Sequence, residues 1–290
     1  MLRAMIGCVA VLLACGAAVA EVTTLSVRYA DGDVALEGFL ALPEGATEAA
    51  AQTLPGVLVI HEWWGLGDYA KGRAKQLAER GYVAFAADMY GQGKVTEHPD
   101  QAGEWAKAIT ANREAFRKRA QLGLEVLAQQ QMVDPARLAA IGYCFGGATV
   151  FELAYSGADV RAVVGFHGSL PTPAEGDVAN IKATILACHG ANDPMVSDDK
   201  VAAFVSAMKQ AQGVDWMLIQ YGGAMHSFTV PGAESRNIPG IAYNAAADER
   251  SWSHAMLLLS EKLAAPAAPA APADAAPTDA AQDPAPQPTE

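Results

Sequence analysis

Basic residues, cysteines and paired metal ligands are scarce in this sequence of 290 residues. Its 20 Lys and Arg face 32 Asp and Glu, and the formal net charge is −12 at pH 7. This charge argues against nucleic acid as a partner, because the phosphate backbone is bound by clustered positive charge. The four cysteines are too few for a disulfide framework, and none forms the CxxC or Cys/His pairs of a zinc site. The sequence therefore predicts no metal site.

Apolar residues, in contrast, make up 51% of the chain, while charged residues make up only 18%. This composition is typical of a globular protein that buries a large core. We expect one domain, or at most two.

The first 20 residues have the layout of a secretory signal peptide. A single positive charge, Arg3, precedes an uncharged run that closes on small residues at 18–20. The run is short and followed directly by Glu21, so it lacks the flanks of a membrane span. We predict cleavage after position 20 and an exported protein, periplasmic or secreted. A lipoprotein is the alternative, because residues 12–16 resemble the box that exposes a lipid-anchored cysteine, here Cys15.

Alanine and proline dominate the other end of the chain. Residues 264–290 contain 12 Ala and 7 Pro, with four acidic side chains and no basic one. Such a segment cannot form a packed core, so we predict a disordered, extended acidic tail. Setting both ends aside leaves residues 21–263 as the folded domain.

Short apolar runs alternate with helical patterns in this domain. Helical patterns at 69–80 and 198–212 follow a predicted capping residue, Asp68 or Ser197, and each ends at a glycine. Continuous apolar runs suit parallel strands that are covered on both faces. Six runs have the length of strands: 57–60, 82–87, 138–141, 162–166, 184–188 and 216–219.

An antiparallel hairpin is expected ahead of these runs, because 22–29 and 34–42 are separated by the turn Asp31-Gly32. The alternation that follows predicts an α/β protein, a doubly wound and mostly parallel sheet with helices on both faces. The ligand site of such a sheet lies at the carboxyl ends of its strands. We therefore expect functional residues just after the apolar runs.

The sequence GYCFGG at 142–147 directly follows one of these runs and precedes a helical pattern that extends to Tyr155. Cys144 thus lies in a GxCxG motif at a strand-to-helix turn, where a side chain on either glycine would collide with a neighbouring strand or helix. The amino-terminal dipole of the helix favours a thiolate, and the Phe145 N–H is placed to donate to an oxyanion. Cys144 is the predicted nucleophile.

A thiol nucleophile needs a base and an orienting carboxylate. In a sheet that carries its nucleophile at such a strand-to-helix turn, the three residues follow along the sequence in the order nucleophile, acid, base. The sequence HGANDP at 189–194 contains Asp193, and GGAMHSF at 222–228 contains His226. Alone, these residues are more typical of a turn aspartate and a surface-loop histidine than of a catalytic pair. Beside the cysteine motif they predict a triad of Cys144, His226 and Asp193.

A fourth cluster follows the first parallel run, in HEWWG at 61–65. Glu62 is surrounded by aromatic residues, and the N–H of Trp63 is the candidate for the second oxyanion donor. A solvated loop glutamate is the alternative for Glu62. His61 and His189 are expected to make structural hydrogen bonds, whereas the sequence offers no partner for His98, His167 or His254.

The domain resembles the dienelactone hydrolase family in five motifs that occur in the family's order: HEWWG at 61–65, ADMYG at 87–91, GYCFGG at 142–147, HGANDP at 189–194 and HSF at 226–228. The resemblance implies an α/β-hydrolase fold and the triad Cys144, His226 and Asp193. It also implies that Glu62 is held near the resting thiol and takes part in deprotonating it when substrate binds.

The reaction that this resemblance implies is covalent hydrolysis. The Cys144 thiolate attacks an ester or lactone carbonyl, and the amides of Phe145 and Trp63 hold the oxyanion. His226 then activates the water that hydrolyses the thioester. No metal or organic cofactor takes part.

Two arginines that hold the carboxylate of dienelactone in the family are missing here. Their places are taken by Gln92, two residues after Tyr90, and by Val230, four residues after His226. Neither side chain can make the bidentate contact of a guanidinium. We therefore expect a neutral ester or lactone as substrate.

The predicted substrate pocket is aromatic and mainly apolar. Its candidate lining residues, some of which are equally expected in the core, are Trp63, Trp64, Tyr90, Phe145 and Phe228. Lys94 and Arg236 are candidates for a positive charge from another direction, and the sequence places neither.

Two other functions stay open. A non-catalytic exported binding protein would keep the fold and the cleft, but it has no need for a complete triad. A redox-active thiol protein would pair Cys144 with Cys188, whereas a hydrolase has one reactive and one inert thiol. Cys188 closes an apolar run and is expected to be a buried strand thiol.

Overall fold

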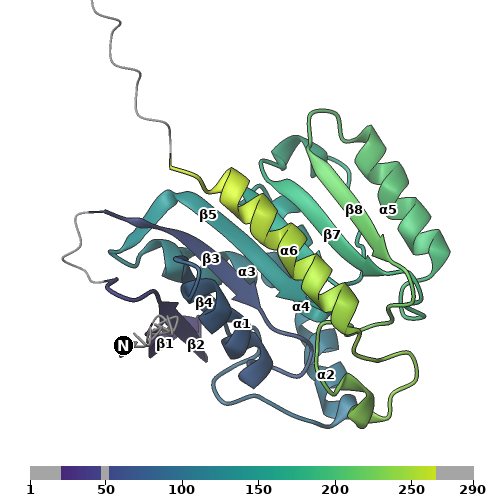
Figure 1. Ribbon diagram of the computed structural model, residues 1–290, viewed down its shortest axis with the longest axis horizontal. Helices are drawn as coiled ribbons and strands as arrows, with labels where there is room; N and C mark the ends of the chain where they lie inside the picture. The colour runs from purple at the N-terminus through teal and green to yellow at the C-terminus, as the bar shows by residue number, and fades with distance from the viewer. Residues whose placement is uncertain (1–20, 47–51, 266–290) are drawn as a thin grey trace, which may run out of the picture.

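The computed structural model describes residues 21–46 and 52–265. The predicted signal peptide and all but two residues of the predicted tail lie outside this part of the chain. An eight-stranded sheet forms the centre of the molecule, with helices on both faces (Figure 1). The predicted α/β architecture is confirmed.

The strands follow one another across the sheet in the order β1-β2-β4-β3-β5-β6-β7-β8. Only β1 with β2 and β2 with β4 pair antiparallel, so the predicted hairpin at the start of a parallel sheet is confirmed. The strands are β1 (Thr23–Asp31), β2 (Val34–Leu42), β3 (Leu54–Ile60), β4 (Val83–Ala87), β5 (Val133–Tyr143), β6 (Ala162–Phe166), β7 (Thr184–Gly190) and β8 (Trp216–Tyr221).

Successive side chains of the central strands enter two apolar clusters on opposite faces of the sheet. Along β3, Leu58 and Ile60 belong to one cluster and Val57 and Val59 to the other. Helices α3 (Arg113–Ala128), α4 (Phe145–Tyr155) and α5 (Asp198–Gln210) cover the first cluster. Helices α1 (Asp68–Ala78) and α6 (Ala245–Lys262) cover the second, and Figure 1 shows α6 lying across the strands.

Three further helical elements complete the described part: α2 (Pro99–Thr110), which packs on α3, η1 (Val178–Asn180) and η2 (Ala233–Arg236). Within residues 21–46 and 52–265, no helix has the length and hydropathy needed to cross a bilayer.

The predicted helix caps were partly wrong. Gly67 is the N-cap of α1, and Asp68 is the first helical residue. The Asp68 carboxylate faces the dipole of the first turn without making a capping hydrogen bond. Ser197 is the N-cap of α5, but its side chain makes no capping hydrogen bond. The side-chain caps lie elsewhere, at Asn112 before α3 and Asn244 before α6, each of which accepts a backbone N–H.

Strand β5 is longer than its apolar run predicted. It begins at Val133, and its first residues, including Asp134 and Arg137, are partly exposed. Polar side chains on this outer part hide the strand from a search for continuous apolar residues. The error does not affect the carboxyl end of β5, where the predicted functional residues follow.

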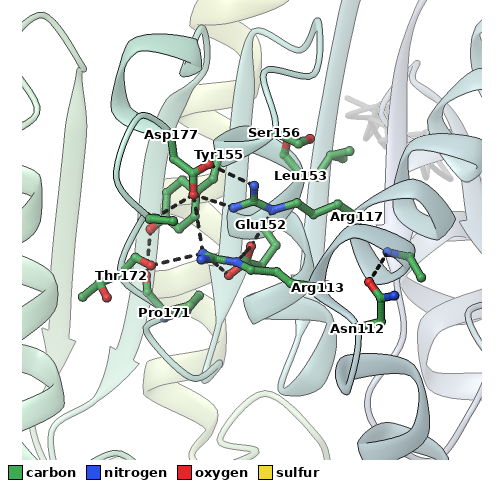
Figure 2. Close-up of polar contacts among 12 residues, drawn as sticks. Asn112, Arg113, Arg117, Glu152, Leu153, Tyr155, Ser156, Pro171, Thr172 and Asp177 are labelled. Atoms are coloured by element: carbon green, nitrogen blue, oxygen red, sulfur yellow. Dashed lines mark hydrogen bonds and ion pairs between the residues drawn. The ribbon is translucent and has the colours of Figure 1, made fainter.

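An ion-pair cluster ties α3 to α4 and to the segment before η1 (Figure 2). Arg117 donates to both carboxylate oxygens of Asp177 at 2.9 and 2.6 Å and to Glu152 at 2.8 Å. Arg113 makes a bidentate pair with Glu152, with both distances 2.7 Å. Because Glu152 lies on α4, which begins beside Cys144, the cluster fixes the far half of that helix.

We expect Glu152→Gln to lower the free energy of unfolding by about 1–3 kcal/mol, because both guanidiniums then lose a charged acceptor in a partly buried site. Urea denaturation followed by circular dichroism measures the change. Glu125→Gln, an exposed substitution on α3, is the control and should change stability by less than about 0.5 kcal/mol. Equal effects of the two substitutions would show that the cluster contributes nothing.

Candidate active site

Cys144 lies between the end of β5 and the start of α4, as the motif predicted. Its backbone has φ 54° and ψ −112°, a conformation that L residues rarely adopt. The Cys144 N–H donates to the carbonyl of Phe166 on β6 at 3.0 Å, and its own carbonyl accepts from Gly147 at 3.0 Å. These bonds from β6 and α4 hold the strained residue in place.

The two glycines that flank the cysteine have no room for a side chain. A Cβ on Gly142 would overlap the carbonyl oxygen of Gly146 in the first turn of α4. A Cβ on Gly146 would overlap the carbonyl oxygen of Ile60 at the end of β3. Both obstacles are backbone atoms, so the collision predicted from the sequence is confirmed, and the elbow depends on glycine.

His226 and Asp193 meet Cys144 from loops that follow two other strands. The Nε2 of His226 lies 3.1 Å from the Cys144 Sγ, and its Nδ1 lies 2.8 Å from Oδ2 of Asp193. The second oxygen of Asp193 accepts the N–H of Met195 at 2.8 Å, which fixes the carboxylate. The structure therefore brings the three predicted triad residues together in the predicted order of contacts.

The surroundings of His226 favour its charged form. Burial by itself opposes the imidazolium, but the neighbouring Cys144 and Asp193 side chains raise the pKa of His226 well above its ordinary value.

Glu62 is buried beside the histidine loop. Its Oε1 accepts the hydroxyl of Ser227 at 3.0 Å, so the alternative of a solvated loop glutamate is wrong. Burial raises the pKa of Glu62, while the Ser227 hydrogen bond, His226 and Arg236 act in the opposite direction. The thiol has His226 as its hydrogen-bond partner, and Glu62 has Ser227.

A cavity of about 280 Å³ opens above the Cys144 thiol. Trp63 and Phe145 border it, as predicted, and α2 adds Ala106 and Thr110. The other lining residues are Phe116, Cys144, Ala148, Ser169, Met195, Val196, His226 and Ile241. No Lys, Arg, Asp or Glu of the described chain is among them.

Three residues predicted to line this cavity lie elsewhere. Phe228 is fully buried and packs against His167 and Tyr221 in the core cluster of α1 and α6. Trp64 borders a separate cavity of about 260 Å³. Tyr90 borders a third, of about 310 Å³, behind Phe145. Aromatic residues follow the strand ends as predicted, but the sequence could not say toward which side each ring turns.

The side chains at the positions of the missing arginines, and the two candidate cations, all lie outside the Cys144 cavity. The amide of Gln92 donates to the exposed carboxylate of Glu37 at 2.9 Å, and Val230 is buried in a small apolar cluster. Arg236 lies 4.0 Å above the ring of Trp64, and Lys94 borders the cavity of Tyr90. Neither cation lines the Cys144 cavity.

The histidines outside the triad include two that were predicted to be structural, His61 and His189, and one, His167, for which the sequence offered no partner. His61 bonds to the Glu62 carbonyl through Nδ1 and accepts the Met89 N–H at Nε2, as predicted, whereas Nδ1 of His189 has no partner among the described residues. His167 lies against the catalytic pair and bonds to the Thr229 hydroxyl at 2.7 Å. Its position after a strand was the only signal in the sequence.

Cys188 lies on the other face of the sheet from Cys144. It belongs to the cluster under α1 and α6, whereas Cys144 packs against the cluster under α3 and α4. Burial raises the pKa of the Cys188 thiol to about 12, and neither Cys144 nor Cys188 forms a disulfide. The prediction of an inert strand thiol is confirmed, and a Cys144–Cys188 redox pair is wrong.

Within residues 21–46 and 52–265, no group of three or more His, Cys, Asp or Glu side chains is placed to hold a metal ion. The arrangement found, a cysteine at a strand–helix elbow with a histidine and a buried aspartate from later loops, defines an α/β-hydrolase.

Comparison with known proteins places the chain more narrowly. The model of the dienelactone hydrolase family matches residues 36–263. Protein usf of Aquifex pyrophilus is 31% identical over 210 residues, which span 70% of this chain and 85% of that protein. A putative carboxymethylenebutenolidase of Aquifex aeolicus is 30% identical over 213 residues, again with 70% and 85% covered.

Among solved structures, a dienelactone hydrolase-like promiscuous phosphotriesterase, P91, from metagenomic libraries is 41% identical, with a TM-score of 0.79. The similarity covers 83% of this chain and 98% of that one. The chain belongs to the dienelactone hydrolase family, and it is a hydrolase of the ester and lactone class.

We expect Gly146→Ala to lower the free energy of unfolding by about 2–4 kcal/mol or to prevent folding, because the new methyl group meets the backbone of β3. Gly72→Ala is the matched control, since it lies within α1 with open space around it and should stabilise the protein by up to about 1 kcal/mol. Urea denaturation compares the two. A Gly146→Ala protein as stable as Gly72→Ala would contradict the packing argument.

A pH-dependent effect is expected for Glu62→Gln. Because burial raises the pKa of Glu62, the unfolded chain releases this proton before the folded chain does, and the wild type loses stability as the pH rises above the ordinary pKa near 4.5. Glutamine carries no such penalty. The free energy of unfolding of the variant relative to wild type should therefore rise between pH 4.5 and pH 8, as measured by urea titration, and a constant difference would argue against the buried carboxyl.

Proposed function

We propose that the protein hydrolyses a small, uncharged ester or lactone by covalent catalysis at Cys144. One observation carries the proposal: Nε2 of His226 is 3.1 Å from the Cys144 Sγ while Nδ1 bonds to buried Asp193. A binding protein that only used the cleft would not require these three groups to be aligned.

In the first half of the reaction the Cys144 thiolate attacks the carbonyl carbon, and the carbonyl oxygen becomes an oxyanion. Phe145 is the first residue of α4, where its N–H has no intrahelical acceptor, and Trp63 donates to no backbone carbonyl of the described residues. Both amides are therefore free for the oxyanion. Collapse of the intermediate leaves a thioester, and the imidazolium of His226 gives its proton to the departing alcohol oxygen.

In the second half, neutral His226 takes a proton from water, and the resulting hydroxide attacks the thioester. The second intermediate releases the carboxylic acid and restores the thiolate–imidazolium pair. Asp193 orients the ring and stabilises its charge throughout. Glu62 borders the same loop through Ser227, and its participation in deprotonating the thiol stays a prediction from the family resemblance.

The cavity favours an uncharged substrate. Its lining contains no Lys or Arg, and the positions of the missing arginines are occupied by an outward-facing amide and a core valine. A carboxylate brought into this space would lose its hydration without gaining a charged partner. At about 280 Å³ the cavity is at the small end for ligand sites, so a short acyl group suits it.

A second candidate activity is hydrolysis of neutral phosphate triesters. The relative named as a promiscuous phosphotriesterase is 41% identical over nearly its whole length. A phosphotriester also lacks charge and develops negative charge on an oxygen during attack, so the same cavity and amides suit it.

We also propose that the protein is exported, on the signal-peptide layout of residues 1–20, with the lipid-anchored form at Cys15 as the alternative. Mass spectrometry of the protein recovered from the native cell decides between an amino terminus at Glu21 and a lipidated Cys15. An intact terminus at Met1 would contradict both.

The activity is tested with aryl esters, lactones including dienelactone, and a dialkyl aryl phosphate. Cys144→Ala should reduce ester hydrolysis by about 10³-fold or more, because it removes the nucleophile. Cys188→Ala is the matched control and should retain activity within a few-fold, since its thiol is buried on the other face. Mass spectrometry should find the acyl group on tryptic peptide 138–161, which contains no cysteine other than Cys144.

Neutral esters should be turned over faster than dienelactone. Equal turnover by wild type and Cys144→Ala would overturn the mechanism. Tight binding of esters without turnover by any form would favour the non-catalytic binding protein.

A further inference from the structure

A buried network of hydrogen-bonded polar side chains lies behind His226, on the side away from the cavity. Three residues after the histidine, the fully buried Thr229 places its hydroxyl 2.7 Å from Nε2 of His167 and 2.6 Å from the hydroxyl of Tyr69. The ring of His167 in turn meets that of His226 edge to face, with centroids 5.5 Å apart. The loop that carries the base is thus bonded to α1 and to the end of β6.

Arg73 of α1 donates the first hydrogen bonds of this buried polar network. Its Nε donates to the Tyr69 hydroxyl at 3.1 Å, and its Nη2 donates to the carbonyl of Thr229 at 3.0 Å and to Asp248 of α6. Because a guanidinium can only donate, the Tyr69 hydroxyl accepts from Arg73. The same hydroxyl donates to the Thr229 carbonyl at 3.1 Å, and the Thr229 hydroxyl lies between Tyr69 and His167, within hydrogen-bond distance of both.

The same guanidinium also contacts the nucleophile side of the site. It lies 5.6 Å from the ring centroid of Tyr143, the residue that immediately precedes Cys144. Tyr143 stacks on Phe166, whose carbonyl accepts the Cys144 N–H. One buried cation therefore touches the residue before the nucleophile and the backbone of the loop that carries the base.

We propose that Arg73 is a positioning residue for the Cys144–His226 pair. Resting on the function proposed above, the inference is that Arg73 holds the histidine loop and the cysteine elbow at the separation in which Nε2 reaches the sulfur. A displacement of about 1 Å is enough to cost an enzyme about 10²-fold in rate.

A second histidine, His167, lies next to His226 in an environment that favours its neutral form. The titratable and charged groups around His167 are His226, Arg73, Tyr143 and, through Thr229, Tyr69. Burial, followed by the positive charges of His226 and Arg73, holds the pKa of His167 well below its ordinary value. A neutral His167 does not compete with His226 for the proton of Cys144.

The test measures the pair without any substrate. Alkylation of Cys144 by iodoacetamide is followed against pH in the full chain, with the modified fraction read on tryptic peptide 138–161 by mass spectrometry. The wild-type pH midpoint is the reference for the variants. Arg73→Met should raise the midpoint and lower kcat by about 10²-fold with little change in KM.

Two further variants keep the test decisive. Thr229→Val has the shape of threonine and loses only the hydroxyl bonds, so it should move the midpoint in the same direction and lower kcat by about 3–10-fold. Arg73→Lys keeps a cation, but one ammonium nitrogen cannot replace the four donations that Arg73 makes from Nε, Nη1 and Nη2, so this variant should lie between Arg73→Met and wild type. If Arg73→Met does not fold, Thr229→Val decides.

Arg117→Met is the matched control. Arg117 binds two carboxylates in a largely buried site (Figure 2). It lies on α3, which covers the opposite face of the sheet from α1 and Arg73. The substitution should lower the melting temperature and leave the alkylation midpoint unchanged. A wild-type midpoint that Arg73→Met and Thr229→Val also leave unchanged would overturn the inference alone. Equal ester turnover by wild type and Cys144→Ala, in contrast, would overturn the proposed function itself.

Discussion

Close packing where β3, β5 and α4 meet is the constraint on which the rest of the site depends. Gly142 and Gly146 let the backbone of the first turn of α4 approach the carboxyl ends of both strands, and no other residue fits at either position. Between them Cys144 is held at a positive φ, at a cost of about 1–3 kcal/mol that the surrounding hydrogen bonds offset. The strain turns the thiol out of the sheet, where the base can reach it.

The parallel sheet determines what the thiol meets there. Strands β5, β7 and β8 end at the same edge, so loops far apart in sequence deliver Cys144, Asp193 and His226 to one point. Burial strengthens the interaction between His226 and the Asp193 carboxylate, because little water screens them. The buried Asp193 has its second oxygen satisfied by a backbone amide, which makes a carboxylate tolerable in that place.

The cations near the site stabilise the scaffold and do not face the cavity. Arg236 stacks on Trp64, Arg73 bonds to the histidine loop from behind, and Arg117 joins α3 to α4. The cavity is left mainly apolar, with Cys144 and His226 in its lining. This distribution of charge fits a neutral substrate and excludes the guanidinium clamp that the family uses for a carboxylate.

Much of this protein could be predicted from its sequence, because the relevant signals are local. Apolar runs predicted the strands, GYCFGG predicted the elbow, and residues after strand ends predicted the triad, since each depends on backbone geometry within a few residues. Ring direction is a different matter: Trp64, Tyr90 and Phe228 follow the right strands but turn away from the Cys144 cavity, because their rings are placed by packing against distant elements. The same holds for Arg73, Thr229 and His167, which lie far apart in the chain. The sequence by itself determined the fold and the chemistry of the nucleophile, whereas only the tertiary structure decided which side chains line the cavity and which support the base, because those contacts join residues that no local pattern connects.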